Sequence, residues 1–73
     1  EEIDFKSKLF IWCQRKKLEL LFYLVSELHV NGIWEYTIQV QINQQEYGMG
    51  KGSSKKVAEQ IAAKETFELL GEI

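Results

Sequence analysis

The chain has 73 residues, of which 45% are hydrophobic and 12% aromatic, so it is long enough for one small domain and too apolar for a disordered segment. A formal net charge of −2 argues against nucleic-acid binding by overall charge, and no apolar run approaches the roughly 18 residues of a membrane span. The single cysteine, Cys13, excludes an internal disulfide framework and fits a reducing compartment. We therefore expect one domain over residues 1–73, inside the cell (nucleus or cytoplasm) and without a membrane partner.

The first expected element is a helix over residues 4–17. Its apolar residues recur at three- and four-residue spacing: Phe5, Leu9, Trp12 and Cys13. Asp4 is suited to the N-terminal end of the helix, and the basic run 15–17 is suited to the C-terminal end. Phe10 and Ile11 do not fit the apolar face, and Ile11 is expected to project toward solvent.

Three strands are expected next, over residues 20–28, 33–43 and 44–49. The clearest signal is the alternation in the second of them, where one face is apolar: Trp34, Tyr36, Ile38, Val40 and Ile42. This pattern, together with Trp12 in the first helix, predicts that Trp12, Trp34 and Tyr36 lie in the core. Residues 29–32 are expected to form the loop before this strand, because Asn31-Gly32 is a strong hairpin turn signal.

A second helix is expected over residues 54–70, with Ser53 or Ser54 as its N-cap and Gly71 as its stop signal. Its expected inward stripe is Ala58, Ile61, Ala62, Thr66, Leu69 and Leu70. The order helix, three antiparallel strands, helix predicts an α+β fold in two layers, with both helices on one face of the sheet.

Catalytic and metal chemistry find little support in the residues. His29 is the only histidine and Cys13 the only cysteine, and no His, Cys and carboxylate set has the spacing of a metal site. Ser53 and Ser54 have no evident base. We therefore predict no enzyme, no metal and no cofactor in this chain.

The segment 48–56 is a candidate phosphate site. It holds three glycines, two serines and three lysines just before a helix, where backbone N–H groups and the helix dipole attract anions. The G-x-x-x-x-G-K-[ST] spacing of a nucleotide-binding loop is absent. An ordinary turn followed by a capped helix with a solvated lysine pair explains the same residues, so spacing alone leaves both interpretations open.

A family resemblance favours the phosphate site. The run from Gly50 to Ala58, continued by Ala62-Ala63, resembles the pattern G-x-G-x-S-K-K-x-A-x-x-x-A-A of double-stranded-RNA-binding domains. Leu9, Trp12 and Gln14 resemble the family's first-helix pattern L-x-x-Y-x-Q. Residues 36–40 resemble its second strand. Trp12-Cys13 and residues 47–50 resemble the N-terminal domain of the RNA helicase A type.

The resemblance implies a way of binding. Such domains read the shape of an A-form duplex over about 16 base pairs, through two minor grooves and the phosphates between them. It implies three groups of contacts: Ser54, Lys51, Lys55 and Lys56 with phosphates; Ser7, Lys8, Phe10 and Ile11 in one minor groove; and His29, Val30, Asn31 and Gly32 in the next. The expected role is an auxiliary module of a larger RNA-processing or helicase-type protein, in which any catalysis lies elsewhere.

Departures from the family pattern keep an alternative open. Glu59 replaces a frequent third lysine, and is expected to support Lys55 across one helical turn. Ile11 stands where a glutamate is usual, and the loop lacks the usual Gly-Pro-x-His. The exposed pair Phe10 and Ile11 could instead serve a protein partner, so the alternative is a docking or dimerisation module.

Overall fold

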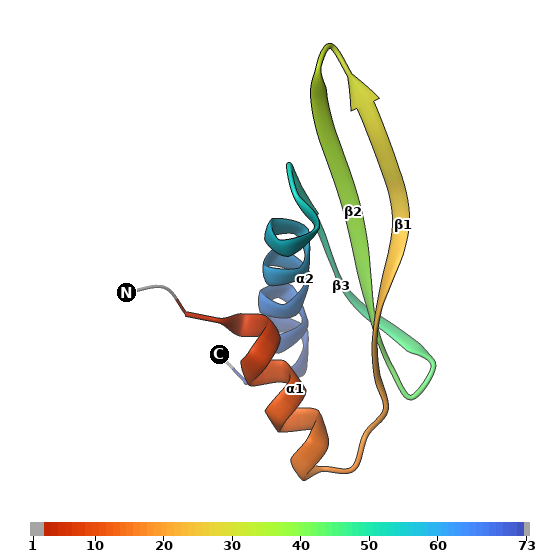
Figure 1. The fold of residues 1–73 in the computed structure, drawn as a ribbon. Coiled ribbons are helices and arrows are strands. Elements are labelled where there is room, and N and C mark those ends of the chain that lie inside the picture. Colours follow the sequence, from red (N-terminus) through yellow and green to blue (C-terminus); the bar gives the residue numbers. More distant parts are fainter. Residues whose placement is uncertain (1–2, 73) are drawn as a thin grey trace.

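The computed structural model describes residues 3–72; residues 1, 2 and 73 of the expected domain lie outside the described residues. The elements are α1 (Phe5–Arg15), β1 (Leu20–Val30), β2 (Ile33–Ile42), β3 (Gln45–Gly52) and α2 (Lys55–Leu70). The strands form one antiparallel sheet in the order β1-β2-β3, and both helices lie on the same side of it (Figure 1). The predicted α+β architecture is confirmed. No helix in the part of the chain described here is long and apolar enough to cross a membrane.

Helix α1 presents its predicted apolar face to the rest of the domain. Leu9 and Cys13 are buried, and Phe5 and Trp12 are half-buried against the same core. Burial raises the pKa of the Cys13 thiol, so this side chain stays neutral and packs as a small apolar group. The helix is shorter than expected, because it ends at Arg15 and the backbone turns left-handed at Lys17, with φ 59°.

The β1–β2 hairpin closes with a two-residue turn. Asn31 and Gly32 have φ values of 53° and 76°, the two positive values that a type I′ turn requires. Val30 pairs with Ile33 and His29 pairs with Trp34, so both residues 29 and 30 belong to β1. The expected four-residue loop is therefore wrong, and the strands continue to the turn itself.

The hairpin extends past the N-terminal end of α2 (Figure 1). Tyr36 pairs with Gly52, the last residue of β3, so Trp34 lies beyond the third strand. Trp34 is 43% exposed and Tyr36 is half-buried. The expectation that Trp34 lies in the core is wrong, because the alternation places it on the helix side of the sheet at a level that the helix does not reach.

Helix α2 packs closely on β3 through small residues. A Cβ atom on Gly48 would lie 2.6 Å from the backbone nitrogen of Thr66, and one on Gly50 would meet the carbonyl oxygen of Ala58. Neither the helix nor the strand has room for larger groups where they touch. The fully buried residues of the contact are correspondingly small: Ala58, Ala62, Ala63 and Thr66.

The inward face of α2 is rotated from the predicted stripe. Ile61 and Leu69 are 45% and 62% exposed, so their predicted burial is wrong. Ala63 and Phe67 are buried instead, and the Phe67 ring lies 6.4 Å from that of Phe5 in α1. The inward face is rotated because α2 packs on β3 and also against α1. The sequence pattern predicted only one apolar stripe along the helix.

Thr66 contributes a buried hydrogen-bond relay between β3 and α2. Its Oγ1 accepts from the backbone N–H of Gly48 at 3.0 Å and donates to the carbonyl oxygen of Ala62 at 2.8 Å. We expect Thr66→Val to lower the free energy of unfolding by about 1–3 kcal/mol, because the buried Gly48 N–H loses its acceptor. Thr66→Ser keeps both bonds and should cost only about 1 kcal/mol for the missing methyl group. Denaturant unfolding checks this order, and a Val variant more stable than the Ser variant would contradict it.

Candidate nucleic-acid interface

The N-terminus of α2 is the most regular part of the candidate site. Ser54 caps the helix, with an extended backbone and a side-chain oxygen that accepts from the N–H of Val57 at 3.1 Å. Lys55 and Lys56 are its first two residues, and both are exposed. Both lysines add positive charge to the end of the helix at which the dipole is positive. This end of the helix is therefore built to attract an anion.

The three lysines of the glycine-rich segment point in different directions. The Nζ atom of Lys55 lies 6.0 Å from the ring centroid of Tyr36, toward the hairpin. Lys56 lines a groove with Asp4 and Gln60, toward α1. Lys51 lies on β3 between Gly50 and Gly52, which both face α2, so its side chain leaves the sheet on the other face. The structure thus brings Lys55 and Lys56 together with Ser54, and it places Lys51 apart from them.

Asp4 connects the start of α1 to α2. One oxygen of its carboxylate accepts from the backbone N–H of Ser7 at 3.1 Å and from the side-chain amide of Gln60 at 2.7 Å. The other oxygen accepts from the Ser7 hydroxyl at 2.8 Å. The backbone N–H of Phe5 in turn donates to Gln60 at 2.8 Å. The predicted N-cap is confirmed, and the hydroxyl proton of Ser7 is already used within the domain.

These hydrogen bonds make Asp4 sensitive to acid. The amide of Gln60, followed by the N–H and hydroxyl of Ser7, lowers the pKa of Asp4 from its ordinary value of 3.8 to about 2. A lowered pKa in the folded state stabilises the fold above pH 3.8, and this contribution disappears as the pH falls toward 2. Asp4→Asn keeps a capping oxygen but cannot ionise. We expect the variant to lose less stability than the wild type between pH 4 and pH 2, as measured by denaturant unfolding. Parallel losses in both proteins would contradict the assignment.

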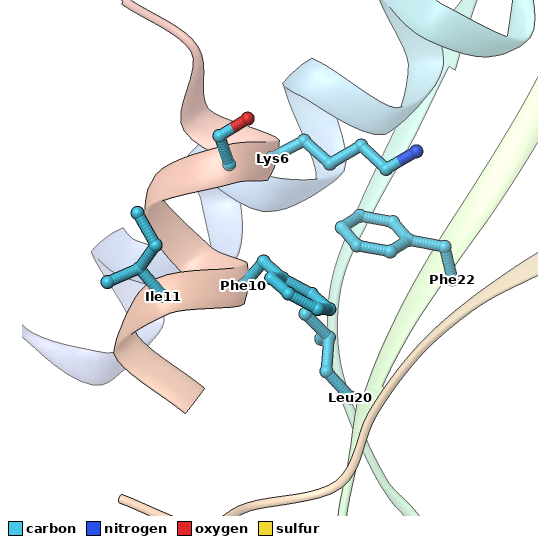
Figure 2. A pocket seen from close by; sticks show the side chains of 6 residues that line it. Lys6, Phe10, Ile11, Leu20 and Phe22 are labelled. Atoms are coloured by element: carbon cyan, nitrogen blue, oxygen red, sulfur yellow. The ribbon is translucent and has the colours of Figure 1, made fainter. Parts of the chain in front are cut away.

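A groove between α1 and β1 holds most of the first-helix candidates. Ser7, Phe10 and Ile11 line it from α1, and Leu20 and Phe22 line it from β1 (Figure 2). Phe10 is 60% exposed and Ile11 47% exposed, as expected for residues outside the apolar face. Lys8 lines a second groove with Trp12 and Arg15, and Ile11 borders both grooves. The four first-helix candidates therefore line two grooves that meet at Ile11.

A salt bridge crosses the top of this groove. Lys6 extends over the Phe22 ring (Figure 2), with its Nζ atom 5.4 Å from the centroid. The same Nζ atom lies 2.9 Å from the carboxylate of Glu59. Glu59 was expected to support Lys55 within α2, and the structure pairs it with α1 instead. The sequence could not show this pair, because the two residues come together only when α1 packs on α2. The negative charge of Glu59 is therefore compensated by Lys6, and Lys55 is left to interact with a ligand.

The hairpin carries the remaining candidates. Asn31 is exposed in the turn, and His29 is exposed in β1 with its ring stacked on Trp34, at 4.5 Å between centroids and 19° between planes. The Trp34 ring also stacks on the Tyr36 ring, with 6.0 Å between centroids and 16° between planes. Sequence reasoning missed Trp34 as a surface residue. The available signal was its position just after the turn, where no third strand or helix is expected beside it.

The part of the chain that the structure describes holds no group of three His, Cys, Asp or Glu side chains arranged to bind a metal ion. Two of the candidate regions, the N-terminus of α2 and the outer part of the hairpin, are joined where Lys55 lies over the Tyr36 ring. Phe10 and Ile11 add an apolar surface on α1. This combination suits a polyanion that also presents sugar or base surfaces.

Comparisons with known proteins agree with this chemistry. Residues 5–70 match the model of the family described as the double-stranded RNA binding motif. The chain is 38% identical over 68 residues to a protein named Ribonuclease 3 from Azobacteroides pseudotrichonymphae, covering 92% of this chain and 26% of the relative. It is 36% identical over 72 residues to Ribonuclease 3 from Shouchella clausii, covering 97% of this chain and 28% of the relative. The chain thus spans about a quarter of the length of these relatives.

Proposed function

Since the chain belongs to the double-stranded RNA binding motif family, we propose that it binds duplex RNA by shape, mainly through phosphates at the N-terminus of α2. The observation that carries the proposal is the capped helix end, where Ser54, Lys55 and Lys56 lie together. The α1 groove and the hairpin are the expected minor-groove contacts on either side. Because the contacts go to phosphates and 2′-hydroxyls, base sequence should matter little.

The role in a longer protein is also part of the proposal. We infer that the chain is an auxiliary module that places an RNA-processing or helicase-type protein on duplex RNA, inside the cell. The name Ribonuclease 3 of these relatives supports an RNA-processing parent. About three quarters of each relative's length lies outside the match, which supports further domains in such a parent. Catalysis in such a parent would belong to another domain.

A titration tests the proposal directly. The protein is added to an RNA duplex of roughly 20 base pairs, to a DNA duplex of the same sequence and to one RNA strand, at low and at moderate salt. Binding should favour the RNA duplex strongly over both others and should weaken steeply with salt, because lysine–phosphate contacts release counterions. Equal binding to both duplexes would leave only nonspecific attraction. An absence of RNA-duplex binding at low salt would refute the proposal.

Self-association is a second candidate, favoured by exposed apolar side chains. Besides Phe10 and Ile11, the sheet face away from the helices carries six such residues, which are 41–66% exposed: Leu21, Tyr23, Leu28, Val30, Ile33 and Met49. Half-exposed side chains of this size offer on the order of 80 Å² each, or roughly 500 Å² for all six. A standard interface buries about 800 Å² per partner, so a second copy docked on this face should be held weakly.

Sedimentation of the isolated domain distinguishes the two surfaces. Ile11→Glu places a charge on the apolar α1 surface. Tyr23→Thr removes an aromatic ring from the outer sheet face while keeping a residue that favours strands. A concentration-dependent dimer that only one variant dissociates would identify the surface used. A monomer at all concentrations, unchanged by either variant, would exclude self-association.

A further inference from the structure

The β1–β2 hairpin carries an aromatic ladder, by which we mean His29, Trp34 and Tyr36. The three rings are nearly parallel, with angles of 19° and 16° between neighbours. Strand pairing produces this arrangement, because His29 lies directly opposite Trp34, and Trp34 and Tyr36 are two residues apart on one face of β2. The strand pairing therefore preorganises the three rings in the absence of a ligand.

The ladder is larger than the fold requires. Trp34 leaves 43% of its surface exposed, and His29 is exposed beside it, while the apolar core on this face begins four residues further along β2, at Ile38. A turn of two residues closes this hairpin without help from aromatic groups. The core therefore does not account for a stacked tryptophan at the end of the hairpin.

Charges at the ladder differ on its two sides. On the α2 side, Lys55 lies over the Tyr36 ring, and this lysine belongs to the proposed phosphate site. On the β1 side, Glu27 lies opposite Tyr36 and disfavours a phosphate there. A nucleotide bound at the ladder would therefore have its phosphate toward α2 and its base toward Trp34 and His29.

We propose that the ladder stacks one unpaired nucleobase of an RNA whose duplex lies on the N-terminus of α2. The inference rests on the proposed function and adds a structural preference to it. Bases within an A-form helix are stacked on each other and cannot reach an aromatic side chain, whereas a base in a bulge or at a duplex end can. Stacking of one base on an aromatic side chain contributes about 1–3 kcal/mol, so the preference should be measurable.

The test compares two RNAs of roughly 20 base pairs that differ by a single unpaired adenosine at the centre of one strand. The wild type should bind the bulged RNA at least about fivefold more tightly than the paired one. Trp34→Val, which keeps a strand-forming residue, should bind the two RNAs with equal affinity, because the preference for the bulged RNA is lost. Trp34→Phe should restore part of the preference. Ile33→Thr, next to Trp34 but on the other sheet face, should keep the full preference.

The outcomes separate this inference from the proposed function. Wild-type binding to both RNAs with equal affinity overturns the ladder as a base site and leaves duplex binding intact. So does a Trp34→Val variant that weakens both RNAs by the same factor, since the ring would then only support the hairpin. Absence of binding to either RNA overturns both. Quenching of Trp34 fluorescence by the bulged RNA alone, in a Trp12→Phe background, is the result expected for stacking.

Discussion

The double variant Lys55→Ala/Lys56→Ala is expected to bind an RNA duplex roughly 10- to 100-fold more weakly than the wild type. Each lysine is exposed at the N-terminus of α2, and each is expected to make one charge-assisted contact with a phosphate. The slope of log K against log salt should become shallower by about two, because two phosphates are no longer neutralised by the protein. Fluorescence anisotropy at several salt concentrations measures both quantities. Folding should be unaffected, because neither side chain contributes to the core.

A matched control removes the same charge elsewhere. Lys16→Gln/Lys17→Asn acts at the far end of α1, where Lys16 lies over the Trp12 ring and Lys17 has a left-handed backbone that asparagine tolerates. This variant should bind at most a few-fold more weakly, through reduced general electrostatic attraction. If both double variants weaken binding equally, binding depends on net charge, and the helix end has no special role.

The largest expected effect on stability comes from Gly50→Ala. The added methyl group would collide with the carbonyl oxygen of Ala58 and would also lie only 2.9 Å from the side chain of Ile61. Backbone atoms of a helix cannot yield as a flexible side chain does, so α2 must separate from β3. We expect a loss of about 4 kcal/mol or more, which is enough to unfold a domain of this size.

Gly32→Ala provides the comparison for Gly50→Ala. Gly32 has a φ of 76° and no atom within 4 Å of the added methyl group, so only backbone strain opposes the change. This strain should cost about 1–2 kcal/mol. Thermal unfolding, followed by circular dichroism, should therefore show a modestly destabilised Gly32→Ala and a largely unfolded Gly50→Ala. The reverse order would show that the β3–α2 contact is looser than the structure describes.

Local patterns predicted the elements well. The three- and four-residue spacing of Leu9 and Cys13 identified the buried face of α1, and the alternation from Ile38 to Ile42 identified the core strand. Asn31-Gly32 identified the turn, and Gly71 identified the end of α2, where its backbone is left-handed at φ 75°. Each of these signals depends on neighbours in the sequence, so it can be read without the fold.

Contacts between distant elements could not be read in this way. The salt bridge from Lys6 to Glu59 and the bond from Gln60 to Asp4 join α1 to α2. The rotation of α2 that buries Phe67 depends on the same packing. Trp34 has the sequence pattern of a core residue but is exposed, because β3 ends opposite Tyr36 and α2 does not extend to the level of Trp34.

The family motif, from Gly50 to Ala58, has two separable functions in this structure. Gly50 and Ala58 allow β3 and α2 to touch, which is a requirement of the fold. Lys55 and Lys56 face solvent and do not belong to the buried core. A chain could therefore keep the glycines and alanines for packing while losing RNA binding, so the lysine pair is the part of the motif that argues for function.

Amide chemical shifts, recorded while an RNA duplex of roughly 20 base pairs is added, would show directly whether the three proposed regions bind together. We predict perturbations in three segments, 5–11 in α1, 29–34 in the hairpin and 52–57 at the start of α2, which follow one common binding curve. The outer sheet face around Leu21, Tyr23 and Met49 should be unperturbed. Changes confined to that face, or spread evenly over every exposed lysine, would contradict duplex binding through these three regions.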